Sequence, residues 1–253
     1  MIPHGIRHGA FATTLTAIAL ATAACGGHAA ASVASSASYP ALDGAQLKSA
    51  LLADSDMPAG AGLTADDSQS GNHSPTVTSP TPSPAGSGVS GAAASDPACA
   101  ALAGALAQSA SDKGGDGSNA YADTGFQTAD DGTTVSETLE AYPAEDLSAL
   151  RSRLSLVRGS MARCSTLTTM TSTVSATAVS APTLGDGSAW FSFTDTLENH
   201  IIKLATTTIV VGNVGITLSI GSGGPGSVNP VPVLETIAQK AVARVTSLQK
   251  QVG

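Results

Sequence analysis

The chain has 253 residues, a net charge of −8 at pH 7, and only 12% charged and 3% aromatic residues. This length suits one folded domain of ordinary size with flanking segments. The acidic balance disfavours a nucleic-acid partner, because phosphate backbones bind to basic surfaces. With so few aromatic side chains, the hydrophobic core must be built mainly from Ala, Leu, Val and Ile.

Residues 1–24 follow the pattern of a secretory signal peptide. A single cation, Arg7, precedes an uncharged run that ends in small residues. That run has about 16 residues, whereas a membrane-spanning helix needs roughly 20. The small residues directly before Cys25 are similar to the lipobox of bacterial lipoproteins, which predicts a lipid on Cys25 and a place on the extracytoplasmic face of the cell membrane. The alternative is plain secretion after cleavage next to one of the alanines.

Residues 25–40 contain this cysteine and a low-complexity stretch that is typical of a flexible tether. We expect a single α+β domain over residues 41–253. Its first helix is predicted at Asp43, because Asp43 is a favourable N-cap and Gln46, three residues later, completes a capping box. The dipeptide Met57-Pro58 is expected to end this helix.

Residues 66–95 are rich in Ser, Thr, Pro and Gly and have almost nothing apolar to bury, so we predict a disordered or polyproline-like loop. Its hydroxyl side chains are either glycosylation sites or simply polar loop residues. A second helix is predicted from Asp96-Pro97, where an N-cap residue precedes a proline in the first helical position. Cys99 lies on the apolar face of this helix, at helical spacing from Leu102 and Leu106.

A β-hairpin is predicted next, because two strands, over residues 120–128 and 133–142, flank the turn sequence Asp130-Asp-Gly-Thr. Pro143 then opens the most regular helix in the sequence. Its apolar residues follow at steps of three and four: Leu147, Leu150, Leu154, Val157 and Met161, with Cys164 continuing the series. Four arginines of this region are expected on the solvated flank of the helix and not at an anion site: Arg151, Arg153, Arg158 and Arg163.

Four further strands and a final helix complete the predicted fold. The strands are expected over residues 167–181, 189–195, 201–211 and 214–220, with turns at 184–187 and 212–213, and the helix starts near Pro232. Because short turns join neighbouring strands, the sheet should be antiparallel. The predicted class is therefore α+β, an antiparallel sheet with helices packed on one face.

Few residues have the spacing that enzyme chemistry needs. After signal cleavage the histidines are His28, His73 and His200, and only His200 lies outside the predicted tether and loop. We expect His200 to face solvent at the start of a strand rather than to act as a base. Residues 221–226 match a G-x-G-x-x-G pattern, but Pro225 and the missing acidic residue about 20 positions later exclude a dinucleotide site. We therefore predict no catalytic residue, no metal and no cofactor.

We predict a disulfide between Cys99 and Cys164. Both residues lie on apolar helix faces, and the compartment outside the membrane is oxidising. Lipid on Cys25 also leaves an even number of cysteines for pairing. The alternative is a pair of buried free thiols.

Several short pieces follow one another across residues 42–250: residues 51–60, a helix opened near Cys99, residues 135–143, Cys164, residues 184–187 and a closing strand pair with its helix. Together they resemble the extracellular sensor domain of PknH-type actinobacterial kinases and the stand-alone lipoproteins similar to it. The resemblance implies an α+β cleft protein that is held by two disulfides and senses an unidentified ligand outside the membrane. Cys99 and Cys164 match the first disulfide of that family, and its second has no counterpart here.

The predicted function is a membrane-anchored extracytoplasmic lipoprotein that binds a small molecule, lipid or glycan as a sensor or accessory module. The ligand is expected in a cleft between the strands of residues 167–220 and the last helix. Trp190 is the candidate binding residue, because alternation places it on the opposite face of its strand from Phe191 and Phe193. The alternative is that Trp190 is simply packed beneath a helix.

Two other functions stay open. A cell-envelope hydrolase would need a polar cluster in a pocket, formed by His200 with Asp195 or Glu198. A purely structural envelope lipoprotein would lack a deep cleft.

Overall fold

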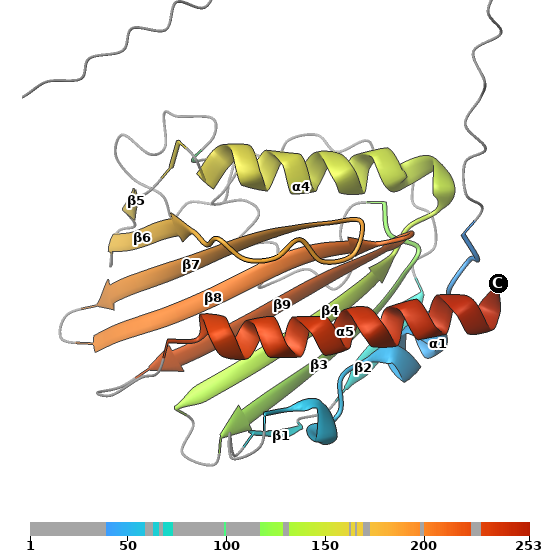
Figure 1. Ribbon diagram of the computed structural model, residues 1–253, viewed down its shortest axis with the longest axis horizontal. Coiled ribbons are helices and arrows are strands. Elements are labelled where there is room, and N and C mark those ends of the chain that lie inside the picture. The colour runs from blue at the N-terminus through green and yellow to red at the C-terminus, as the bar shows by residue number, and fades with distance from the viewer. Residues whose placement is uncertain are drawn as a thin grey trace, which may run out of the picture. The chain divides into compact units, whose positions relative to one another are not determined.

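The computed structural model describes residues 39–58, 63–65, 68–72, 99, 117–128, 132–161, 163–164, 166–168, 173–197, 200–223 and 229–253. The predicted signal peptide, the lipidation site at Cys25 and most of the tether lie outside these residues. The described residues belong to one compact unit, Ser38–Gly253. In this part of the chain nine strands form a single antiparallel sheet, in the order β1-β3-β4-β9-β8-β7-β6-β5 with β2 also paired to β3 (Figure 1). The predicted α+β class with an antiparallel sheet is confirmed.

Long strands form the centre of the sheet and short strands its edges. The strands are β1 (Leu63–Ala65), β2 (Gln69–Asn72), β3 (Ala120–Thr128), β4 (Thr133–Ala141), β5 (Thr166–Thr168), β6 (Thr173–Ala178), β7 (Gly187–Leu197), β8 (His200–Val211) and β9 (Val214–Gly223). The helices are α1 (Gly44–Ala50), α4 (Leu147–Met161) and α5 (Val231–Val252), with the 3₁₀ turns η1 (Asp54–Asp56) and η2 (Ala144–Asp146). Among the described helices, none has the length and apolar character that a membrane span requires.

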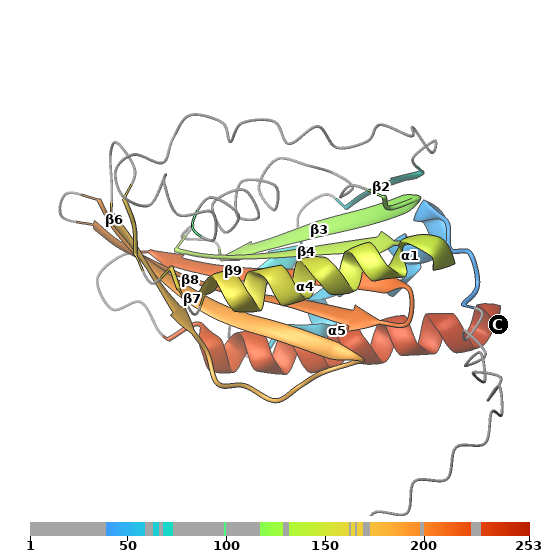
Figure 2. The same ribbon diagram turned by 90° about the horizontal axis from the view of Figure 1, so that it is seen from above.

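The helices cover both faces of the sheet, which differs from the predicted arrangement on one face (Figures 1 and 2). Neighbouring residues of β7 show this: Trp190 packs in the core beneath α1 and α5, whereas Phe191 and Phe193 pack in the core beneath α4. On β8, Ile209 and Val210 likewise belong to opposite cores. The physical reason is that central strands with apolar residues on both faces need cover on both sides.

The predicted hairpin and the regular helix after it are confirmed. β3 and β4 pair in antiparallel register, with Phe126 opposite Val135 and Ala122 opposite Leu139. These four side chains are buried on the face that α1 and α5 cover. The apolar residues of α4 pack on the other face, as their spacing predicts: Leu147, Leu150, Leu154 and Val157.

The strand predicted over residues 167–181 is instead two strands. β5 and β6 pair with each other in antiparallel register, with Thr168 opposite Thr173. The two strands therefore run in opposite directions, and the residues between them lie outside the described part. Thr and Ser alternate with other residues in the same way whether the segment is one strand or two. The alternation in the sequence therefore did not reveal the division.

An unexpected strand lies within the predicted disordered loop of residues 66–95. β2 pairs with β3 through Gln69 opposite Asp123 and Asn72 opposite Ala120. Backbone hydrogen bonds at a sheet edge need no apolar side chains, which is why composition did not indicate this strand. Residues 73–95 of the predicted loop lie outside the described part of the chain.

The first helix begins as predicted and ends earlier. The Asp43 carboxylate accepts from the Gln46 N–H, and the Gln46 side chain accepts from the Asp43 N–H, both at 2.8 Å. This capping box opens α1. The helix ends at Ala50, and η1 follows before Met57.

The tight turn between β8 and β9 connects three parts of the fold. Gly212 has a φ of +60°, a conformation that favours glycine. Its N–H donates to the Asp186 carboxylate at 2.7 Å. At the end of α5, the Gln249 amide donates to the backbone carbonyl of Val211 at 2.9 Å, so the last helix is held against this turn.

Candidate functional site

A pocket of about 290 Å³ lies at the edge of β7, where β6 separates from it. The strand pairing ends with Ala178 opposite Phe191, and one further backbone hydrogen bond joins the Val179 N–H to the Trp190 carbonyl at 3.1 Å. The chain then leaves the edge of β7. The pocket is lined by Val157, Arg158, Ala178, Val179, Ser180, Ala181, Ser188, Ala189, Trp190 and Phe191.

Ser188 fixes the shape of the connection between β6 and β7. Its hydroxyl accepts from the Leu184 N–H at 3.1 Å and lies 3.5 Å from the Pro182 carbonyl, to which it can donate. The Trp190 indole N–H also donates to this hydroxyl, at 3.0 Å. One buried hydroxyl therefore connects the segment of residues 182–184 to the Trp190 indole.

The α4 side of the pocket is formed by Val157, which is buried, and Arg158, whose side chain lies against β7. The Arg158 guanidinium donates twice to the Ser188 carbonyl, through Nε at 3.1 Å and through a terminal nitrogen. Helix α4 and strand β7 approach closely at Gly187. A Cβ atom added to this glycine would lie only 3.2 Å from a Leu154 methyl group. Arg151, Arg158 and Arg163 are all exposed, as predicted for the solvated flank, and Arg158 also lines the pocket.

Trp190 lines this pocket but is largely buried, with 7% of its surface exposed. The cleft predicted between the strands and the last helix is in the wrong place. Four α5 side chains fill that space and are almost fully buried: Leu234, Ile237, Ala241 and Val245. The pocket that Trp190 borders lies instead at the edge of β7, next to α4.

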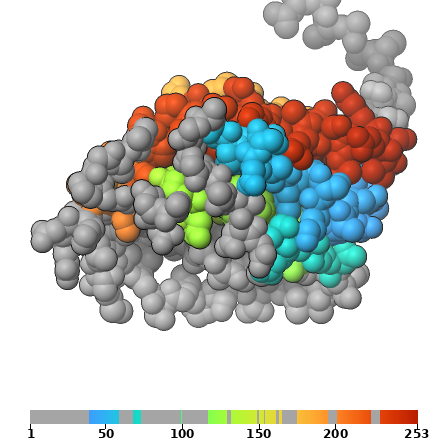
Figure 3. Space-filling view, turned by 90° about the horizontal axis from the view of Figure 1, so that it is seen from below, coloured from blue at the N-terminus to red at the C-terminus, as the bar shows by residue number. Residues whose placement is uncertain are grey.

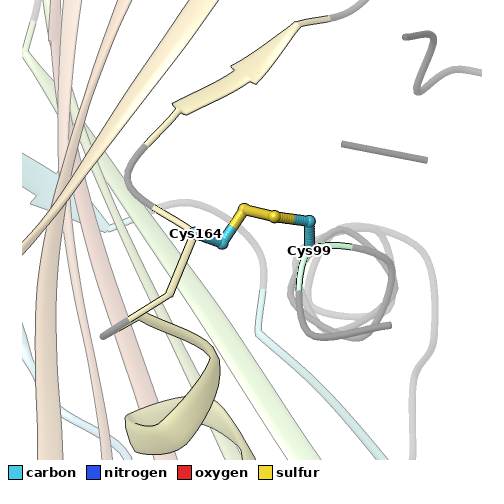
Figure 4. Close-up of a disulfide and its surroundings, with 2 residues drawn as sticks. All are labelled: Cys99 and Cys164. Atoms are coloured by element: carbon cyan, nitrogen blue, oxygen red, sulfur yellow. A yellow bond between two sulfur atoms is a disulfide. The ribbon is translucent and has the colours of Figure 1, made fainter. Parts of the chain in front are cut away.

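The predicted disulfide between Cys99 and Cys164 is present (Figure 4). The Cα atoms are 5.2 Å apart, within the range that a disulfide spans. Cys99 is helical, as predicted, and Cys164 follows the end of α4. Both residues are buried, with Cys164 in the core beneath α4.

A buried carboxyl group, Glu137, lies in the middle of the apolar face under α1 and α5. Its exposed fraction is 0%. One oxygen accepts from the Leu52 N–H at 2.7 Å, and the other has no hydrogen-bond partner among the described residues. Burial raises the pKa of Glu137 to about 8, although the Leu52 hydrogen bond and the nearby Arg244 oppose this shift. Glu137 is therefore protonated in the folded protein at neutral pH.

The segment that Glu137 holds is also held from α5. The Arg244 guanidinium forms an ion pair with the Asp56 carboxylate at 2.6 Å, and the Lys240 ammonium donates to the Asp56 carbonyl. Figure 3 shows η1, in cyan, packed directly against α5, in red. The segment after α1 thus closes the sheet face above Glu137.

The remaining sequence candidates are not brought together by the structure. Cys25, His28 and His73 lie outside the described residues, as does Glu198. His200 is the first residue of β8 and pairs with Leu197, which agrees with its predicted place at the start of a strand. Among the residues that the structure describes, no group of three or more His, Cys, Asp and Glu side chains could hold a metal ion.

Two residues of interest were missed from the sequence. Glu137 could have been found, because the alternation that buries Val135 and Leu139 places Glu137 on the same apolar face. Arg158 could not, because four arginines share its helix region and only the contact with Ser188 distinguishes it.

Comparison with known proteins identifies the fold. No protein-family model and no curated protein matches the sequence. The crystal structure of the extracellular domain of PknH from Mycobacterium tuberculosis superposes with a TM-score of 0.54 at 14% sequence identity, over 84% of this chain and 100% of that one. The chain shares the fold of this domain. The predicted resemblance to the PknH extracellular domain is thus confirmed for the fold.

The chain also matches a second solved structure. It is an uncharacterized protein from Mycobacterium smegmatis, the Rv0999 ortholog, with a TM-score of 0.43 and 13% identity. The match covers 80% of this chain and 97% of that protein.

Proposed function

We propose that this chain is an extracytoplasmic lipoprotein, anchored through lipid on Cys25, whose domain binds a ligand at the edge of β7 as a sensor or accessory module. The observation that supports binding is the pocket. It combines apolar walls with three polar residues, Arg158, Ser180 and Ser188, and small-molecule sites likewise combine apolar walls with a few polar groups. It also borders the sole tryptophan of the chain.

Two observations support a place outside the membrane. The Cys99–Cys164 disulfide is typical of an oxidising compartment, because cytosolic thiols are kept reduced. The fold is that of a domain described as extracellular in PknH. The small residues before Cys25 support the lipid anchor.

Replacing Cys25 with serine is expected to release the protein from the membrane. Three acyl chains hold a protein far more firmly than one chain, and the variant has no thiol to acylate. Membrane and soluble fractions of an actinobacterial host that expresses each form would be compared, together with the intact mass of the membrane-bound protein. A Cys25→Ser variant that stays in the membrane fraction, or a native protein without a lipid adduct, would contradict the anchor.

Ligand binding is expected to change the fluorescence of Trp190. A delipidated sample of the mature protein would be titrated with a lipid and glycan extract of the cell envelope, and emission recorded. Ser180→Phe should abolish the change, because Ser180 is exposed and lines the pocket. Ser155→Phe places the same ring on an exposed position of α4 that does not line the pocket, and should leave the change intact. An unchanged emission in the unmodified protein would count against this site.

A further inference from the structure

We infer that the pocket at the edge of β7 selects small amphiphilic anions and that Arg158 binds their anionic group. This inference rests on the proposed ligand-binding function and specifies its ligand class. It begins from the charges that line the pocket. The ten described lining residues include one charged side chain, Arg158, and no carboxylate. An arginine stays positive at every physiological pH, so the pocket carries a fixed positive charge.

The second step is the orientation of Arg158. Its two donations to the Ser188 carbonyl use Nε and one terminal nitrogen, so the guanidinium plane is held at a defined angle to β7. A guanidinium has five N–H donors in a planar fork, and the remaining donors suit a carboxylate or phosphate. No carboxylate of the described residues lies within ion-pair distance of Arg158. The charge is therefore positioned but not neutralised by that part of the protein.

The third step is the apolar part of the pocket. Val157 and Phe191 belong to the core beneath α4, and Trp190 belongs to the core on the opposite face. The pocket is therefore bordered by one charged residue, Arg158, and by apolar residues of both cores. Its volume of about 290 Å³ is at the small end for ligand sites. A short apolar body with one anionic group fits both features.

The net charge of −8 does not oppose this selection. Charges farther than about 8 Å away are largely screened at physiological ionic strength. A guanidinium in direct contact with the ligand is screened much less. The local charge of Arg158 therefore decides which ligands bind.

The test uses four probes with the same eight-carbon chain: octanoate, octyl phosphate, octanol and octylammonium, all below their micelle-forming concentrations. Trp190 fluorescence reports their binding to the mature protein. We expect one or both anions to bind roughly 10-fold or more tightly than octanol, which is the usual effect of a charged hydrogen bond. Octylammonium should bind most weakly. The two anions distinguish a carboxylate ligand from a phosphate ligand.

Three variants assign the preference to Arg158. Arg158→Gln should bring the affinity for anions down to that for octanol and leave octanol binding within about twofold. Arg158→Lys keeps the charge and should retain the preference. Arg151→Gln removes an exposed charge from the same helix, away from the pocket, and should change nothing. Far-UV circular dichroism checks that each variant is folded, and Arg158→Met, which also removes the charge, replaces Arg158→Gln if that variant does not fold.

The outcomes separate this inference from the proposed function. Equal binding of octanoate, octyl phosphate and octanol, or an anion preference that persists in Arg158→Gln, would overturn the anion inference and leave ligand binding intact. Failure of all four probes, while the envelope extract still changes Trp190 emission in a way that Ser180→Phe blocks, would also overturn the anion inference alone. Failure of both the probes and the extract would overturn the inference together with the proposed function.

Discussion

Replacing Cys99 and Cys164 together with serine is expected to lower the free energy of unfolding by about 4 kcal/mol. The two cysteines are 65 residues apart in sequence, and their disulfide restricts that loop in the unfolded chain. Domains are stable by only about 5–15 kcal/mol. A core with few aromatic side chains should therefore depend strongly on this crosslink, and the variant should unfold at a much lower urea concentration.

Urea denaturation of the mature protein measures this effect, with Cys25→Ser as the common background so that no other thiol is present. Reductant should destabilise the parent protein to the level of the double serine variant and have no effect on that variant. A loss below about 1 kcal/mol would contradict the crosslink's role, because removing a disulfide that closes a loop of this length is expected to cost several times more. Two reactive thiols in the unfolded, unreduced protein would show that the disulfide does not form.

Glu137→Gln is expected to remove most of the pH dependence of stability between about pH 4.5 and pH 8. The pKa of Glu137 is raised by burial from 4.5 to about 8 in the folded protein. Between these values the unfolded chain releases its proton and the folded protein keeps it. Stability then falls as pH rises, because the folded state binds more protons than the unfolded state. Below about pH 4.5 both states are protonated and the effect vanishes.

Glutamine is neutral at every pH, and its side-chain carbonyl can still accept from the Leu52 N–H. Each unit of pKa shift corresponds to about 1.4 kcal/mol, so at pH 8 to 9 the variant should be more stable than the parent by several kcal/mol. At pH 4.5 the two proteins should be nearly equal. Near Glu137, Asp56 opposes ionisation, whereas Arg244 favours it.

Urea unfolding at each pH unit from 4.5 to 9 gives the slope directly. Glu145→Gln serves as the control, because Glu145 is an exposed carboxylate in η2 and its removal should leave the slope unchanged. A parent protein whose stability does not fall between pH 5 and pH 8, relative to Glu137→Gln, would contradict a raised pKa. At low pH, Glu137→Leu should have a free energy of unfolding about 1–3 kcal/mol below that of Glu137→Gln, because the buried Leu52 N–H then has no acceptor.

Local signals predicted most of the elements. The capping box at Asp43, the helical spacing from Leu147 to Val157 and the turn at Gly212 each involve residues that are close in sequence, so their meaning does not depend on the rest of the fold. The disulfide was predicted from two local signals, one at each cysteine. Helical spacing placed Cys99 and Cys164 on apolar faces and so in the protein interior. The signal peptide predicted an oxidising compartment, in which two such cysteines can pair.

The edges of the sheet were predicted less well, because pairing there is made by the backbone. Gln69–Asn72 has no apolar periodicity and becomes β2 only because β3 offers unpaired groups next to it. The division of residues 167–181 into β5 and β6 has a similar cause. Alternation states which side chains share a face but not which strand is the partner.

Sequence by itself determined the α+β class, the antiparallel pairing and the regular helices, because each depends on spacing within a short segment. It indicated the disulfide through the apolar positions of its two cysteines. Tertiary structure decided which face each helix covers, since α4 and α5 are both amphipathic and only packing assigns them to opposite sides. It also decided the candidate site. Arg158 and Ser188 are 30 residues apart in sequence, and only the crossing of α4 over β7 brings the guanidinium to the pocket that Trp190 borders.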